Sequence, residues 1–129
     1  MSAARKLAGR EQARAEEDGE VWRALADPTR RALLDRLRGG ALTTGQLAEG
    51  FAMTRFGVMK HLRVLAEAGL VVVVERGRER VHHLNPVPIR RLSERWLRPF
   101  TNGAALALEG LREVVERGGA RKAKVRRST

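Results

Sequence analysis

One predicted helix of this chain carries, on its solvent side, residues that could contact nucleic acid. Arginine can donate two hydrogen bonds to a guanine edge, and phenylalanine and methionine suit the thymine methyl group. We predict base contacts for four residues, Arg55, Phe56, Met59 and Arg63. Phosphate contacts are predicted for Thr54, Lys60 and His61, with packing as the alternative for His61, and Thr44 is added to the DNA-contacting set. Taken alone, such a basic face could also be an ordinary solvated surface.

Two short helices joined by a tight turn are expected to position these side chains. Thr43 and Gln46 form the T-x-x-Q pattern of a capping box at the start of the first helix. Thr54 can cap the second helix through its hydroxyl. The second helix has apolar residues at the spacing of one buried stripe, Val58, Leu62 and Leu65. A helix that is buried on one side and basic on the other fits the DNA major groove.

A β-hairpin is predicted directly after these helices. Gly69 ends the second helix, residues 70–74 form one strand, and residues 80–84 return as the other after a charged turn at 75–79. Arginines at this predicted tip could reach phosphates or a narrow minor groove, and they are Arg76, Arg78 and Arg80. The alternative is an arginine-rich hairpin that contributes only solubility.

With these elements in place, the chain resembles the ArsR/SmtB-type winged helix-turn-helix repressors, in their cysteine-free branch. The similar segments are ALADPTRRALLDRLRGG, LTTGQLAEGFAMTRFGVMKHLRVLAEAGLVV and GRERVHHLNPVPIRRLSERW, which together span about residues 20–100. The resemblance implies a homodimeric, operator-binding transcriptional regulator, usually a repressor. The expected fold is mainly α with a small antiparallel β-hairpin, a winged helix-turn-helix that dimerises through its terminal helices.

Composition favours a polyanionic partner. The 129 residues include 26 Lys and Arg against 15 Asp and Glu, which gives a net charge of +11. Double-stranded DNA is the first candidate partner and an anionic membrane the second. No apolar stretch approaches the length of a membrane span, and the N-terminus lacks the apolar core of a signal peptide. We therefore expect no membrane partner and a cytoplasmic protein.

The sequence predicts three regions. Residues 1–18 are expected to be a flexible arm or a frayed helix. Residues 19–117 should form the winged domain, with dimerisation helices over 86–117, and residues 118–129 a basic disordered tail. Within the domain, Asp27-Pro28 begins a helix that ends at Gly39-Gly40. Pro99 and the segment Thr101-Asn102-Gly103 are expected to interrupt the C-terminal helices.

The C-terminal helices hold more apolar surface than the winged unit can cover. We predict that a dimer interface buries four of these residues, Trp96, Phe100, Leu108 and Leu111. Pairing would also set two recognition helices roughly 34–36 Å apart, which is one turn of DNA. The alternative is that these residues fold back onto their own subunit.

No metal or other cofactor is expected. The chain has no cysteine, and adjacent strand residues such as His82 and His83 point to opposite faces. Regulation by a small-molecule effector in a dimer-interface pocket stays open. The chain also lacks a recognisable catalytic motif, so an enzyme is not expected. The remaining alternative is a winged-helix interaction module that docks an acidic protein, which would show no preference among DNA duplexes.

Overall fold

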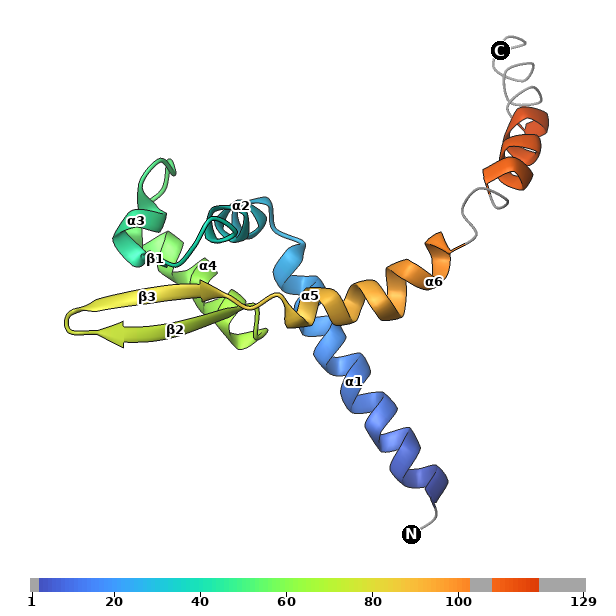
Figure 1. Cartoon of the computed structure of the whole chain (residues 1–129), viewed down its shortest axis with the longest axis horizontal. Coiled ribbons are helices and arrows are strands. Elements are labelled where there is room, and N and C mark those ends of the chain that lie inside the picture. The colour runs from blue at the N-terminus through green and yellow to red at the C-terminus, as the bar shows by residue number, and fades with distance from the viewer. Residues whose placement is uncertain (1–2, 103–107, 119–129) are drawn as a thin grey trace. The chain divides into compact units, whose positions relative to one another are not determined.

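The computed structural model of the chain describes residues 3–102 and 108–118, and the chain divides into two units at Leu92 and Ser93. The elements of the first unit are α1 (Ala3–Leu25), α2 (Pro28–Leu37), β1 (Leu42–Thr43), α3 (Thr44–Ala48), α4 (Arg55–Glu67), β2 (Val71–Arg76), β3 (Glu79–Leu84) and α5 (Val87–Leu92) (Figure 1). This mainly helical unit with a small antiparallel sheet is the predicted winged helix-turn-helix.

The predicted helix caps are confirmed. Asp27 accepts a hydrogen bond at 3.0 Å from the Arg30 backbone N–H, and Pro28 is the first residue of α2. At α3, the Thr43 hydroxyl accepts from Gln46 N, and the Gln46 side chain accepts from Thr43 N, which completes the capping box. These side chains satisfy backbone donors that have no partner inside the helix, so they fix where each helix begins.

A Schellman motif turns the chain from α4 into the sheet. Gly69 has a positive φ of 78°, its N–H bonds to Ala66 O at 3.0 Å, and the N–H of Leu70 bonds to Leu65 O at 2.9 Å. Leu65 and Leu70 are both fully buried, together with Val58, Leu33 and Leu47. The core therefore lies directly behind α4 and holds the predicted apolar stripe of that helix.

The sheet has three strands in the order β1-β3-β2, all antiparallel. β1 was not predicted, because two residues are too few to show a period-2 pattern. The hairpin turn is also tighter than the predicted five residues. β2 and β3 pair as far as Arg76 opposite Glu79, which leaves Gly77, at a φ of +59°, and Arg78 as the turn.

The N-terminal segment is helical where it is described. α1 begins at Ala3, and its first buried residue is Val21. Residues 3–18 are thus part of α1, which continues past residue 18 without a break. The end of α1 is satisfied by side chains from α2, since Arg30 donates to the carbonyls of Arg23 and Ala24.

The second unit holds a π-helix, η1 (Ser93–Leu97), then α6 (Arg98–Thr101), and residues 108–118 are helical. The expected interruption at Pro99 is wrong, because the helical residues continue from η1 into α6 and Pro99 lies in the first turn of α6. Asn102 ends α6. The predicted disordered tail lies outside the described residues except for Gly118, which is helical.

Candidate nucleic-acid interface

The solvent side of α4 carries the predicted base-reading residues. Val58, Leu62 and Leu65 are buried, which fixes the face that α4 turns to the core. The opposite side exposes Arg55, Phe56, Met59, Lys60 and Arg63. Phe56 is 74% exposed and Met59 38%, an unusual exposure for large apolar side chains on a well-packed helix. Such residues are available to a partner surface, and three cations lie among them.

The N-terminus of α4 is capped in a way that also suits an anion. Thr54 Oγ1 accepts a hydrogen bond from Gly57 N at 3.1 Å, as predicted for a cap. Its hydroxyl proton is still free to be donated elsewhere. The positive end of the helix dipole lies at the same place, beside Arg55.

Thr44 is the predicted contact that the structure contradicts. Its side chain is 6% exposed, and its hydroxyl lies 2.9 Å from Nε2 of His82, which is 4% exposed. This hydrogen bond joins α3 to β3 inside the domain. A hydroxyl buried in this way is not available to a phosphate, so Thr44 leaves the candidate set.

His61 lies in contact with other parts of the first unit. Its Nδ1 is 3.4 Å from Nη1 of Arg30 and 3.7 Å from a carboxylate oxygen of Asp27, and the side chain is 23% exposed. These contacts tie α4 to the start of α2. They favour the packing alternative for His61 over the phosphate contact.

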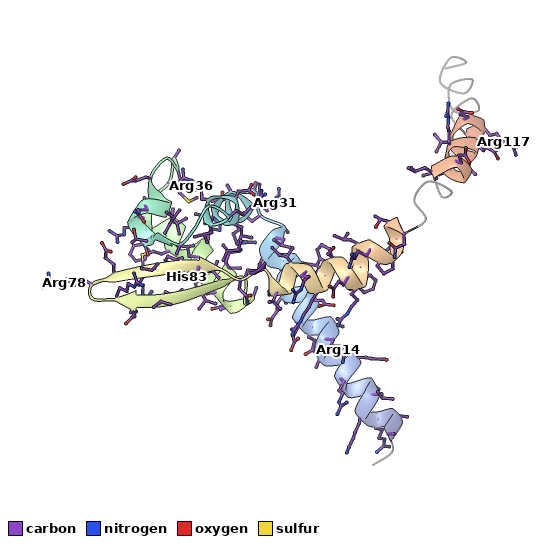
Figure 2. All side chains as sticks on the ribbon, in the orientation of Figure 1. Arg14, Arg31, Arg36, Arg78, His83 and Arg117 are labelled. Carbon is purple, nitrogen blue, oxygen red and sulfur yellow. The ribbon has the colours of Figure 1, made fainter. Side chains whose placement is uncertain are left out.

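The three hairpin arginines do not share the tip. Only Arg78 lies in the turn (Figure 2), whereas Arg76 ends β2 and Arg80 is the second residue of β3. The strand register places Arg80 opposite Glu75, with Nε 3.7 Å from Oε1, on the same face as His82. Arg76 lies on the other face, because successive strand residues alternate.

A hollow of about 280 Å³ separates α4 from the hairpin, and Arg63 and Arg80 both line it. The other lining residues are Thr44, Met59, Leu62, Ala66, Val73 and His82. The two arginines come from different elements but border the same space. This arrangement brings positive charge from α4 and from the hairpin to one space, which suits an anionic partner.

His82 is a neutral part of this hollow at neutral pH. Burial lowers the pKa of His82, and the nearby Arg80 and His83 lower it further. Within the described part of the chain, its Nδ1 has no hydrogen-bond partner. His83 is exposed whereas His82 is buried, so the prediction that the two histidines face opposite sides is confirmed. Over residues 3–102 and 108–118, no group of three His, Cys, Asp or Glu side chains could hold a metal ion.

The arginines of α2 have structural roles that the sequence pattern did not predict. Arg30 contacts the end of α1 and His61, as described above, and Arg31 donates to Leu25 O at 2.8 Å. Arg36 reaches the turn before α4. In the sequence these arginines look like an ordinary solvated basic face. Only the structure shows that they donate hydrogen bonds to carbonyls of other elements.

The predicted dimer residues of the second unit are exposed. The exposed fractions of Trp96, Phe100, Leu108 and Leu111 run from 49% to 72%. Such surface is available for pairing, which remains a prediction. No helix in the described ranges is both long and apolar enough to cross a membrane.

The chain is similar to known regulators over the same elements. A family described as a helix-turn-helix domain matches residues 25–74. The HTH-type transcriptional regulator Rv2034 of Mycobacterium tuberculosis is 40% identical over 90 residues, which cover 67% of this chain and 84% of that protein. The transcriptional repressor SdpR of Bacillus subtilis is 34% identical over 82 residues, covering 64% of this chain and 90% of SdpR.

Solved structures agree with these sequence comparisons. The crystal structure of the ArsR family transcriptional regulator RHA00566 has a TM-score of 0.62 and 35% identity, and the match covers 67% of this chain and 93% of that one. The extent of this match, together with the exposed α4 face and the adjacent hairpin, confirms the resemblance found in the sequence. The chain belongs to the ArsR family of helix-turn-helix transcriptional regulators.

Proposed function

We propose that the protein is a homodimeric repressor that recognises a palindromic operator through α4 and the β2-β3 hairpin. One observation carries this proposal. α4 exposes Phe56, Met59 and three cations on the side opposite its fully buried stripe. A rigid helix with apolar and cationic side chains on its outer side can read base edges in the major groove.

The proposed contacts fall into two groups, those to base edges and those to phosphates. Arg55, Phe56, Met59 and Arg63 would face base edges. Lys60, Thr54 and the hairpin arginines would contact phosphates. Lys60 is exposed and flexible, and such a charge neutralises a phosphate without reading sequence.

Repression follows from where such a dimer would bind. SdpR is named a transcriptional repressor and matches this chain over 90% of its own length. By analogy, occupancy of a site that overlaps a promoter would block polymerase, and no catalytic step is needed. A regulator that acts on chromosomal operators works in the cytoplasm.

Dimerisation would use the apolar residues of the second unit. Trp96, Phe100, Leu108 and Leu111 present exposed apolar surface that a second copy could bury. One protein with the same fold, Mb0332 from Mycobacterium bovis, is described as having a homodimeric winged helix-turn-helix DNA-binding domain. Sedimentation of the intact chain should give twice its 14.4 kDa mass. A monomer that binds a palindrome with full affinity would contradict this part of the proposal.

The test of the proposed function is selection of bound duplexes from a random pool. A repressor of this kind should return a consensus with two-fold symmetry, and binding should weaken steeply as salt rises. Retention of all duplexes equally would favour the alternative, an interaction module that docks an acidic protein. A consensus without symmetry would keep DNA reading and exclude the palindrome.

A further inference from the structure

Arg36 of α2 reaches across to the turn that joins α3 and α4. Its Nη1 donates hydrogen bonds to two backbone carbonyls, to Leu47 O at 2.9 Å and to Glu49 O. The guanidinium carbon lies 4.4 Å from the centre of the Phe51 ring, in a cation–π contact. One side chain therefore contacts the end of α3 and two residues of the turn after it.

Gly50 lies against the same guanidinium. Its φ is +82°, a conformation that glycine adopts without strain. A Cβ at this position would come within 2.6 Å of Arg36 Nη2. Gly50 thus permits the contact with Arg36 in two ways. Its backbone adopts the positive φ of the turn, and it has no Cβ that would collide with the guanidinium.

The turn needs such a contact because α3 is short. α3 has five residues, so most of its carbonyls have no partner within the helix. The guanidinium satisfies the Leu47 carbonyl at the end of α3 and the Glu49 carbonyl that follows. Charge-assisted hydrogen bonds of this kind are the stronger ones in proteins.

The turn leads directly to the DNA-facing end of α4. Thr54 caps α4, and Arg55 and Phe56 are its first two residues. The buried stripe fixes which side of α4 faces inward, and the turn is the segment that leads the chain into the N-terminal end of this helix. A shift of that end would move the proposed base-reading residues without unfolding the core.

We propose that Arg36 is a positioning residue, which sets how the N-terminal end of α4 meets DNA without touching DNA itself. This inference rests on the proposed function of α4 in base reading. It predicts that loss of Arg36 weakens discrimination between duplexes more than it weakens attraction to phosphates. A direct phosphate contact would have the opposite effect.

The experiment compares Arg36→Met and Arg36→Lys with the wild-type protein. The control is Arg38→Met, since the Arg38 side chain is 75% exposed and forms an ion pair at 3.5 Å with the exposed Asp35 of α2. Dissociation constants are measured on a duplex selected by the wild-type protein and on a scrambled duplex, each across a salt series. The folded fraction of each variant is measured by circular dichroism and thermal unfolding.

Arg36→Met should bind the selected duplex about tenfold more weakly, because the start of α4 is no longer held where its side chains can read bases. Its affinity for the scrambled duplex and its salt slope should stay close to those of the wild type. Arg36→Lys should show a smaller loss, because lysine can keep one carbonyl contact but not the planar stacking on Phe51. Arg38→Met should leave the ratio of the two affinities unchanged.

Gly50→Ala provides a second test that keeps Arg36 itself. The added Cβ should push the Arg36 guanidinium away from the turn, and a residue with a Cβ is strained at a φ of +82°, so this variant should also lose discrimination while keeping its affinity for the scrambled duplex. If Arg36→Met does not fold, the proposal is tested with Arg36→Lys and Gly50→Ala. Equal losses on both duplexes, with a salt slope lower by about 1, would show a phosphate contact and overturn the proposal.

Two further outcomes would overturn the proposal. Equal losses that follow only a reduced folded fraction would show a purely structural role for Arg36. An unchanged affinity ratio in all three variants would show that the turn does not position α4. Failure of the proposed function is distinguishable from both, because the wild-type protein would then select no consensus.

Discussion

α4 and the β2-β3 hairpin lie beside the same hollow, but the core holds them very differently. α4 buries Val58, Leu62 and Leu65 completely or nearly so. In β2, every residue after Val71 is exposed, including Val72, at 50%. A helix fixed in this way can present side chains at defined positions, whereas the end of the hairpin beyond its pairing with β1 can adjust to a phosphate backbone. The difference suggests that discrimination resides in α4 and that the hairpin contributes mainly attraction.

The largest expected effect concerns stability. Leu65→Ala should lower the free energy of unfolding by about 2–5 kcal/mol, because it leaves a cavity behind α4. Val74→Ala in the exposed hairpin should cost less than about 1 kcal/mol. Urea unfolding followed by circular dichroism measures both changes.

Val58→Ala is the matched control for Val74→Ala, since the same change is made at a position that is 0% exposed. It should cost clearly more than Val74→Ala. Similar losses at the two valines would show that the hairpin is as firmly packed as α4, which would remove the basis of the comparison.

The second effect concerns DNA. Arg63→Ala should cost on the order of 1–3 kcal/mol on a selected duplex and relax the preference at one position per half-site. Arg78→Ala, at the tip of the hairpin, should weaken selected and scrambled duplexes equally and lower the salt slope by about 1. Anisotropy titrations across a salt series separate the two patterns.

The base-reading role of Arg63 needs the stricter test of the two, because Arg63 borders the hollow together with Arg80 and could contact a phosphate there. Should Arg63→Ala reproduce the pattern of Arg78→Ala on both duplexes, Arg63 is a phosphate contact. Specificity would then rest on Arg55, Phe56 and Met59, nearer the start of α4.

A smaller effect should appear at acidic pH. The pKa of His82 is lowered in the folded state, so the unfolded chain takes up a proton first as the pH falls. The folded protein should therefore lose stability as the pH drops through the ordinary histidine range, near 6.5 and below. Urea unfolding at several pH values measures this loss, which His82→Gln should reduce.

His83→Gln is the control for this effect, because His83 is exposed on the other face of the same strand. It should leave the pH dependence of the unfolding free energy almost unchanged. A pH dependence that survives His82→Gln would have to come from other groups.

The smallest expected effect is none at all. Zinc, nickel or cobalt should not change the dissociation constant for DNA, because the chain has no cysteine and His82 and His83 lie on opposite faces of β3. A titration with a chelator control measures this. A stoichiometric metal that releases DNA would point to ligands drawn from two subunits.

Much of the fold could be predicted because its signals are local. The caps at Asp27, Thr43 and Thr54, and the Gly69 turn, each depend on residues close together in sequence. The two-residue strand β1 was missed because its pairing partner in β3 lies far along the chain.

The site was predicted less well where a side chain meets a distant partner. Thr44 bonds to His82, 38 residues away, and His61 meets Arg30, 31 residues away. Helical spacing predicts which side of a helix is buried. It does not predict which distant residue contacts a given side chain, so neither partner could be inferred. The exposed face of α4 was predictable because its burial follows from the apolar period of the helix itself.

The position of β2 in the sheet has a consequence for the protein at high concentration. β2 is an edge strand of the described sheet, and Val72, Val73 and Val74 along it are exposed. An open, β-branched edge can pair with the edge of another molecule, and charged residues are a common defence against such aggregation. Glu75 and Arg76 follow the valines directly. The charges beside the hairpin tip can thus keep neighbouring molecules apart whenever no DNA is bound.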